Sequence, residues 1–165
     1  MDLVSHALMG TCIAAATPEG LTWRSAAMYA AASLAPDLFF VPLGLALGRA
    51  NRRLLWIPRA ADWMGCRARY PRATALSWDA PYSILGASLA MLALGAWSWW
   101  LALAYGLHIA VDYPTHHGEW AVRPLFPFSK RQWQGFSSAW EWPLPAMALA
   151  WAVLGLLLVL LVALR

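Results

Sequence analysis

Long hydrophobic stretches, interrupted by polar residues at only a few places, dominate this chain. The clearest is residues 143–164, PLPAMALAWAVLGLLLVLLVAL, which carries no charge before Arg165. As a helix this stretch rises about 33 Å, enough to cross the hydrocarbon core of a bilayer. The pattern therefore predicts a C-terminal transmembrane helix.

A second hydrophobic stretch covers residues 82–111 and is interrupted near its middle by Gly95 and by Trp97, Trp99 and Trp100. It can form one long tilted helix. It can also form two shorter helices that turn at the tryptophans, whose amphipathic rings prefer the membrane interface. The sequence leaves both arrangements open.

Two further hydrophobic stretches lie at residues 1–16 and 25–48, and the second is broken at Pro36, where proline removes a donor and bends a helix. The first lacks the basic start of a secretory signal and carries Asp2 instead, so we expect it to be retained. The expected fold is all-α, an integral membrane bundle of three to five membrane-associated helices. We expect a single domain over residues 1–165.

Composition supports a membrane location. Of 165 residues, 61% are hydrophobic and 12% are charged, against about a quarter charged in a soluble domain. A small globule with this composition would expose a large apolar surface. Cys12 and Cys66 lack the spacing of a disulfide framework or a thiolate zinc site, so no role is assigned to them.

Positive charge is concentrated in residues 49–80, which we predict to form a basic loop. The arginines of this region are Arg49, Arg52, Arg53, Arg59, Arg67, Arg69 and Arg72. The positive-inside rule places such a loop in the cytoplasm. Because it lacks a nucleic-acid-binding signature, contact with anionic lipid is favoured over RNA binding by about 5:1, and no nucleic-acid partner is expected.

Ionisable residues gather in GLHIAVDYPTHHGEW at residues 106–120, directly after a hydrophobic stretch. Such groups are costly to bury in a membrane and usually mark a site. His108 and Asp112 are spaced i, i+4, which places them on one helix face. Pro114 ends the helix near Asp112, where the helix dipole disfavours a carboxylate unless a cation is present. A hydrogen-bonded His–Asp pair without metal is the alternative.

His6 and Asp37 can lie at the same depth as each other. If residues 17–24 form a turn between antiparallel helices, both are about 18 to 20 Å from it along their helices. A shared metal ion would offset the cost of burying the carboxylate. Alternatively, His6 is an interfacial histidine, and Asp37 caps a helix through the amides of Phe39 and Phe40.

Together these residues predict a metal site with mixed nitrogen and oxygen donors. The predicted ligands are His6, Asp37, His108 and Asp112, with His116 as a further candidate. Such a set suits zinc first, and also manganese or ferrous iron. A metal ion with an open position makes a hydroxide nucleophile from water. Asp79 or Glu119 is then the candidate for proton transfer, and Arg123 for stabilising negative charge.

Three blocks of the chain resemble a known family. They are MDLVSHALMG, SLAPDLFF and GLHIAVDYPTHHGEWAVRPLFPFS, and they cover residues 1 to about 130. The chain resembles bacterial inner-membrane proteins described as LexA-regulated, membrane-bound metal-dependent hydrolases. The family pattern falls here on His6, Pro36, Asp37, His108, Asp112, Thr115, Pro127, Phe128 and Ser129.

The resemblance implies a multi-pass protein of the bacterial inner membrane. The family is in turn similar to zinc-dependent phospholipase C, which implies phosphoester hydrolysis near the membrane, by analogy alone. One feature departs from the family, because Tyr82 and Ser83 stand where family members carry His-Ser. Asp79, about one helical turn earlier, is the candidate replacement for the missing histidine.

The predicted function is therefore a membrane-bound hydrolase that acts on a phosphoester, in a lipid or a small molecule, through metal-activated water. The missing histidine favours a first alternative, a non-catalytic metal-binding membrane protein. A second alternative is a small transporter or ion-conducting protein in which buried histidines and aspartates relay cations. The short chain and the lack of an inverted repeat weigh against that reading.

Overall fold

The computed structural model describes residues 2–58, 60–137 and 142–165, and over these ranges it confirms an all-α fold. Met1, Arg59 and residues 138–141 lie outside the described residues. Among the described residues, extended pairing is limited to an isolated bridge between Val122 and Trp133. The longer helices are α1 (Leu3–Ala16), α2 (Trp23–Leu38), α3 (Val41–Ala50), α8 (Ile84–Gly95), α9 (Trp99–Asp112) and α10 (Leu144–Ala163).

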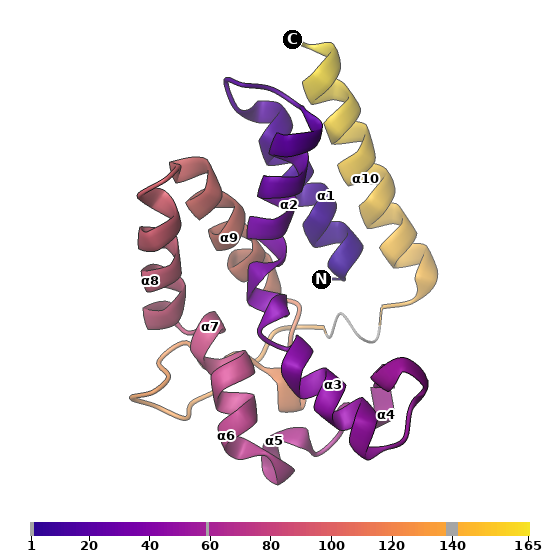
Figure 1. Ribbon diagram of the computed structural model, residues 1–165, viewed down its shortest axis with the longest axis vertical. Helices are drawn as coiled ribbons and strands as arrows, with labels where there is room; N and C mark the ends of the chain where they lie inside the picture. The colour runs from indigo at the N-terminus through magenta and orange to yellow at the C-terminus, as the bar shows by residue number, and fades with distance from the viewer. Residues whose placement is uncertain (1, 59, 138–141) are drawn as a thin grey trace.

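Two helical hairpins form the body of the molecule (Figure 1). Helices α1 and α2 pack side by side, α8 and α9 form the second hairpin, and α9 packs against α2. Helix α10 lies along α1, and α3 to α7 lie beneath the lower ends of the hairpins. This arrangement brings the start of α1 and the ends of α2 and α9 toward the same end of the molecule.

Local sequence explains the first hairpin. The Asp2 side chain accepts hydrogen bonds from backbone N–H groups in the first turn of α1, and Thr22 forms a capping box with Ser25 at the start of α2. At Gly10 the helices approach so closely that a Cβ atom would lie 2.4 Å from the Tyr29 carbonyl oxygen. Glycine therefore permits the contact between α1 and α2.

The sequence left open whether residues 82–111 form one long helix or two shorter ones, and the structure shows the second arrangement. The hydrophobic stretch forms two helices, with the turn after Gly95. Ser83 caps α8 by accepting from the Gly86 N–H at 3.0 Å, and Ser98 caps α9 by accepting from the Trp100 N–H at 3.3 Å. The cap at Ser98 starts a new helix at the tryptophans, so the chain turns back there.

The arginine-rich region is not an extended loop, contrary to the prediction for residues 49–80. It folds into short helical turns, η1 (Leu54–Trp56), α4 (Ala60–Trp63), α5 (Cys66–Arg69), α6 (Pro71–Thr74), η2 (Ala75–Asp79) and α7 (Ala80–Tyr82). Cys66, Trp78 and Tyr82 are buried and pack in one core cluster with Leu47 of α3. These apolar residues join the region to a core that it shares with α3, α8 and α9. The number of arginines in the region gave no indication of this core.

One described helix, α10, is long and apolar enough to cross a membrane, and it matches the predicted helix at 143–164. Helices α2 and α3 meet that criterion only as a pair bent by 52°. Helix α1 has 14 residues and rises about 21 Å, short of the roughly 30 Å hydrocarbon core. Helix lengths therefore support one full span, or two with the bent pair, and not the expected multi-pass bundle.

The close approach at Gly10 can be tested by adding one methyl group. We expect Gly10→Ala to lower the melting temperature of the detergent-purified protein by about 2 to 10 °C, because overpacking costs about 1 to 3 kcal/mol. Gly155→Ala on α10 is the matched control, since an added Cβ there meets no atom within 4 Å. The control should be neutral or slightly stabilising. Equal melting temperatures for the two variants would contradict the packing of α1 on α2.

Candidate metal centre

The structure brings three of the four principal predicted ligands, His6, His108 and Asp112, within ligand distance of one another, and leaves Asp37 of α2 at the edge of this group. His6 Nε2 lies 3.1 Å from Asp112 Oδ1, and His108 Nε2 lies 3.1 Å from Asp112 Oδ2. Asp37 Oδ1 lies 3.8 Å from His108 Nε2. His6, His108 and Asp112 are buried, whereas the Asp37 side chain is 23% exposed.

His6, His108 and Asp112 fit a metal ion. Each offers one ligand atom, and these atoms lie within 4.8 Å of one another. Metal–ligand bonds of about 2.05 Å separate neighbouring ligand atoms by about 3.3 Å in a tetrahedral site and about 2.9 Å in an octahedral one. Two histidines and one carboxylate hold catalytic zinc in some enzymes and non-haem iron in others. The group can therefore hold a metal ion, and the donor types alone fit zinc and iron alike.

The outer contacts of the two histidines are less typical of a metal site. Their rings stack with centroids 3.6 Å apart, and the Nε2 atom of each ring lies 3.1 Å from an Asp112 carboxylate oxygen. The Nδ1 atoms of His6 and His108 are buried without a hydrogen-bond partner among the described residues. Histidines that bind metal usually donate the other ring N–H to an acceptor. This difference also fits a cluster held together by hydrogen bonds alone.

Tyr82 belongs to the cluster, although the sequence analysis did not place it there. Its hydroxyl lies 2.7 Å from His108 Nε2, 2.8 Å from Asp37 Oδ1 and 3.1 Å from Asp112 Oδ2. Burial raises the pKa of Tyr82 well above its usual value, and the neighbouring carboxylates add to that shift. Its position in the sequence could have identified it, because Tyr82 stands where members of the family that the chain resembles carry histidine.

His116 lies beside this cluster but outside the group of three mutually close ligand atoms. Its Nδ1 atom is 2.9 Å from the Asp112 carbonyl oxygen and 3.9 Å from Asp112 Oδ1. Its ring centroid is 4.8 Å from that of Trp78. Burial lowers the pKa of His116, which favours the neutral ring. In this conformation His116 packs behind Asp112, and its predicted role as a ligand stays a prediction.

Asp79 is the centre of a separate ionic cluster. Its Oδ1 atom accepts from Arg67 Nη2 at 2.9 Å, and its Oδ2 atom accepts from Arg123 Nη1 at 3.0 Å. Burial raises the pKa of Asp79, and the two guanidinium groups oppose that shift. Because both carboxylate oxygens contact arginines, the structure does not bring Asp79 into the position of the missing histidine. Nothing in the sequence distinguished Arg67 from the other arginines.

Glu119 also makes structural contacts. Its two carboxylate oxygens accept from the backbone N–H groups of Gly65 at 2.7 Å and Arg67 at 2.8 Å. These bonds hold the start of α5, where N–H groups lack partners within the helix. The proposed proton-transfer roles of Asp79 and Glu119 therefore stay predictions, in a structure where both carboxylates already have partners.

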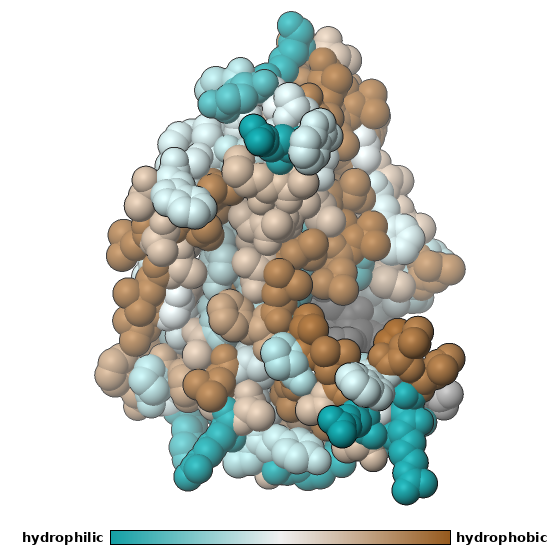
Figure 2. Space-filling model, in the orientation of Figure 1, coloured by the Kyte–Doolittle hydropathy of each residue, from teal (hydrophilic) through white to brown (hydrophobic). Residues whose placement is uncertain are grey.

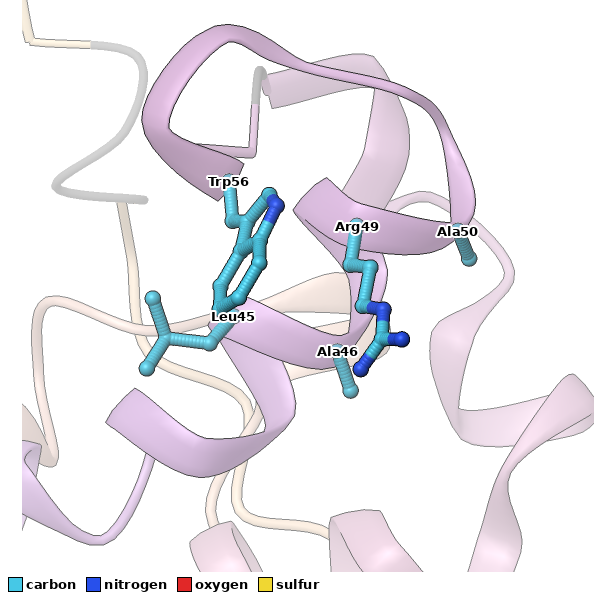
Figure 3. Close-up of a pocket in the computed structure, with 5 residues that line it drawn as sticks. All are labelled: Leu45, Ala46, Arg49, Ala50 and Trp56. Carbon is cyan, nitrogen blue, oxygen red and sulfur yellow. The ribbon is translucent and has the colours of Figure 1, made fainter.

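Open hollows on the surface lie away from the cluster. Figure 3 shows one against α3, where the Arg49 guanidinium lies 5.6 Å from the centre of the Trp56 ring system. The residues that line it are Leu45, Ala46, Arg49, Ala50 and Trp56. A second hollow lies against α10 and is lined by Trp142, Ala146, Leu149, Ala150, Val153 and Leu154. Neither hollow is lined by a cluster residue, so neither leads to the candidate metal centre.

The ionic cluster makes a prediction about Asp79. We expect Asp79→Asn to destabilise the protein by about 3 kcal/mol, because two partly buried arginines lose their counter-charge. Glu19→Gln removes the same charge from an exposed position and should change stability by less than about 0.5 kcal/mol. Thermal unfolding and metal analysis of both variants test the assignment. Normal stability with loss of bound metal in Asp79→Asn would instead identify Asp79 as a ligand.

Comparison of the chain with family models, with curated proteins and with solved structures found no match. The resemblance to membrane-bound metal-dependent hydrolases therefore rests on the three sequence blocks.

Proposed function

We propose that this chain is a membrane-bound, metal-dependent hydrolase that cleaves a phosphoester in a lipid or a small molecule. One observation carries the proposal. Helices α1 and α9, far apart in the sequence, bring His6, His108 and Asp112 together at one buried point, with Asp37 of α2 at its edge. Structural packing alone rarely gathers so many ionisable groups at a buried position.

The chain's own residues divide the work of the proposed reaction. A divalent ion, zinc first and manganese or iron as alternatives, supplies a Lewis acid that activates water and polarises a phosphoryl oxygen. His6, His108 and Asp112 hold that ion. Asp37 is the most exposed of the four predicted ligands, so in this proposal it lies on the side from which a substrate approaches.

Arg123 is the candidate for stabilising an anionic substrate group. Its side chain is 20% exposed, and it bonds Asp79, about one helical turn before Tyr82. The Arg123 Nε atom is buried, so the exposed part of the guanidinium group is the part that can donate to an oxyanion of the substrate. A charge-assisted hydrogen bond of this kind strengthens as negative charge develops.

We further propose a location in the bacterial inner membrane. Figure 2 shows hydrophobic side chains across the middle of the visible face, with polar ones at its upper and lower ends. Helix α10 spans the bilayer in this proposal, while the shorter hairpins enter it from one side. The positive-inside rule then places α3 to α7, and the end of the bundle with the cluster, toward the cytoplasm.

A second candidate function is a non-catalytic membrane protein with the same cluster. The hydrogen bonds from His6 and His108 to Asp112, and from Tyr82 to Asp37, favour it, because they satisfy these groups without a metal ion. The Nδ1 atoms of His6 and His108, which have no hydrogen-bond partner among the described residues, also favour the non-catalytic candidate. Metal content and turnover together distinguish the two candidates.

Metal analysis of detergent-purified protein tests the site. We expect about one metal ion per chain in the wild type and at least tenfold less in His108→Ala and Asp112→Ala, because each variant removes one of three close ligands. His117→Ala is the matched control, since it removes a histidine outside that group and should leave the metal content unchanged. Equal metal content in all four proteins would exclude the site.

The same preparations test catalysis. Hydrolysis of phosphodiesters and phospholipids should be lost on treatment with a chelator and restored by added metal. Metal binding without turnover on any of these substrates would favour the non-catalytic protein.

Cysteine labelling tests the topology. Helices α8 and α9 rise only about 18 to 21 Å, so the turn at Ser98 should lie inside the bilayer and Ser98→Cys should resist aqueous thiol reagents. Ser129→Cys, in the polar part of the chain, should react from the cytoplasmic side. The native cysteines Cys12 and Cys66 are buried and give a low background. Labelling of Ser98→Cys from the periplasm would show that the hairpin crosses completely. Release of the protein by an alkaline wash would contradict membrane embedding.

A further inference from the structure

Helix α3 is apolar on two opposite faces. Leu43 and Leu47 pack inward in the core cluster that α3 shares with α8 and α9. On the outer face Val41, Leu45 and Ala46 are exposed. A helix that is hydrophobic on every side is normally covered on every side. The outer face of α3 therefore calls for an apolar partner that the chain itself does not supply.

The turn that follows α3 extends this apolar face. Leu54 and Leu55 are 86% and 76% exposed, and Ile57 is exposed as well. Leu55 and Trp56 have φ angles of 53° and 57°, in the left-handed region that bulky residues rarely adopt. An added Cβ at Gly48 would overlap the Trp56 carbonyl, so the turn lies tightly against the end of α3. We call the outer face of α3 and the turn at residues 52–57 the α3 surface.

Positive charge lies at the edge of the α3 surface. Arg49 and Arg52 are exposed, and the Arg49 guanidinium lies over the Trp56 ring beside the hollow in Figure 3. Arg53 differs, because its guanidinium donates to both carboxylate oxygens of Asp62 at 2.8 and 2.9 Å. A cationic group next to exposed apolar side chains matches an anionic lipid, which joins a phosphate to acyl chains.

The same combination recurs in residues 124–131. Leu125 and Phe128 are exposed there beside the exposed Lys130 and Arg131. The Pro124 carbonyl accepts from the first N–H of α8, so this segment lies beneath the second hairpin. Figure 1 shows it, in orange, at the same end of the molecule as α3 and on the other side of the bundle. Two separated surfaces of like composition at one end fit a membrane plane better than a single protein partner.

We propose that the α3 surface is a binding site for anionic phospholipid, in which Arg49 and Arg52 contact lipid phosphates while Leu54, Leu55 and Ile57 enter among the acyl chains. The inference goes beyond the proposed reaction and rests only on the membrane location proposed with it. It narrows the lipid contact expected of residues 49–80 to one surface. Such a site holds α3 at the membrane interface and orients the end of the bundle that carries the metal centre.

The test uses the full-length protein in vesicles, with an environment-sensitive fluorophore on Ile57→Cys. The vesicles contain phosphatidylcholine alone or a mixture with phosphatidylglycerol, and each type also carries a lipid quencher near the headgroup. We expect strong quenching in the mixture and weak quenching in phosphatidylcholine. A label on Ala68→Cys should stay unquenched, because this exposed residue lies on α5, farther from the hairpins than α3 (Figure 1).

Charge variants test the role of the arginines. Arg49→Gln should lower the ratio of lipid-exposed to water-exposed label about fivefold, because each arginine near an anionic surface strengthens binding by about this factor. Arg24→Gln is the matched control, since it removes an exposed arginine at the start of α2, at the opposite end of the molecule, and should leave the ratio unchanged. Both substitutions are at exposed positions and should not disturb folding.

Several results would overturn the lipid site. They are equal quenching in the two types of vesicle, equal quenching at residues 57 and 68, and an unchanged ratio in Arg49→Gln. Self-quenching of the label that rises with the protein-to-lipid ratio would instead identify a second copy of the chain as the partner. None of these results bears on the metal content of the same preparations, so the proposed hydrolase would stand. Failure of the protein to stay in the vesicles on an alkaline wash would overturn both the site and the membrane location.

Discussion

The buried carboxylate of Asp112 is the group on which the arrangement of the helices depends. It is 1% exposed and ends α9, where the helix dipole is unfavourable for a negative charge. An isolated carboxylate at such a position is too costly to keep ionised. His6 of α1, His108 of α9 and Tyr82 of α7 all lie within 3.1 Å of its oxygens. The need to compensate this charge therefore ties three distant parts of the chain to one point.

A second layer of charge lies next to the first. Asp79 joins Arg67 to Arg123, and Glu119 holds the backbone at the start of α5. The aromatic pair of Trp78 and Tyr82 connects the layers, because Trp78 directly precedes Asp79 and stacks on the ring that reaches Asp112. A change in the ionic layer can therefore move Tyr82 without touching any candidate ligand.

The spacing of residues along helices was sufficient to predict much of this site. The equal distances of His6 and Asp37 from one turn, and the i, i+4 spacing of His108 and Asp112, depend on local geometry that a sequence displays. The partners of Asp79 and Glu119 depend on contacts between segments far apart, such as the backbone N–H groups at Gly65 and Arg67. His116 lies past Pro114, where helical periodicity no longer gives a direction. Tyr82 was visible as an unusual residue, but its chemistry became clear only from its contacts.

The cluster can be satisfied by protons or by a cation. If both histidines carry the proton on Nε2, they and Tyr82 supply three donors for Asp112 Oδ1, Asp112 Oδ2 and Asp37 Oδ1. A cation in the same place displaces those protons and moves each histidine proton to Nδ1, where no described residue accepts it. An unsatisfied buried donor costs about 1 to 3 kcal/mol. The free energy of metal binding must therefore exceed the cost of two such unsatisfied donors before the metal-bound form is favoured.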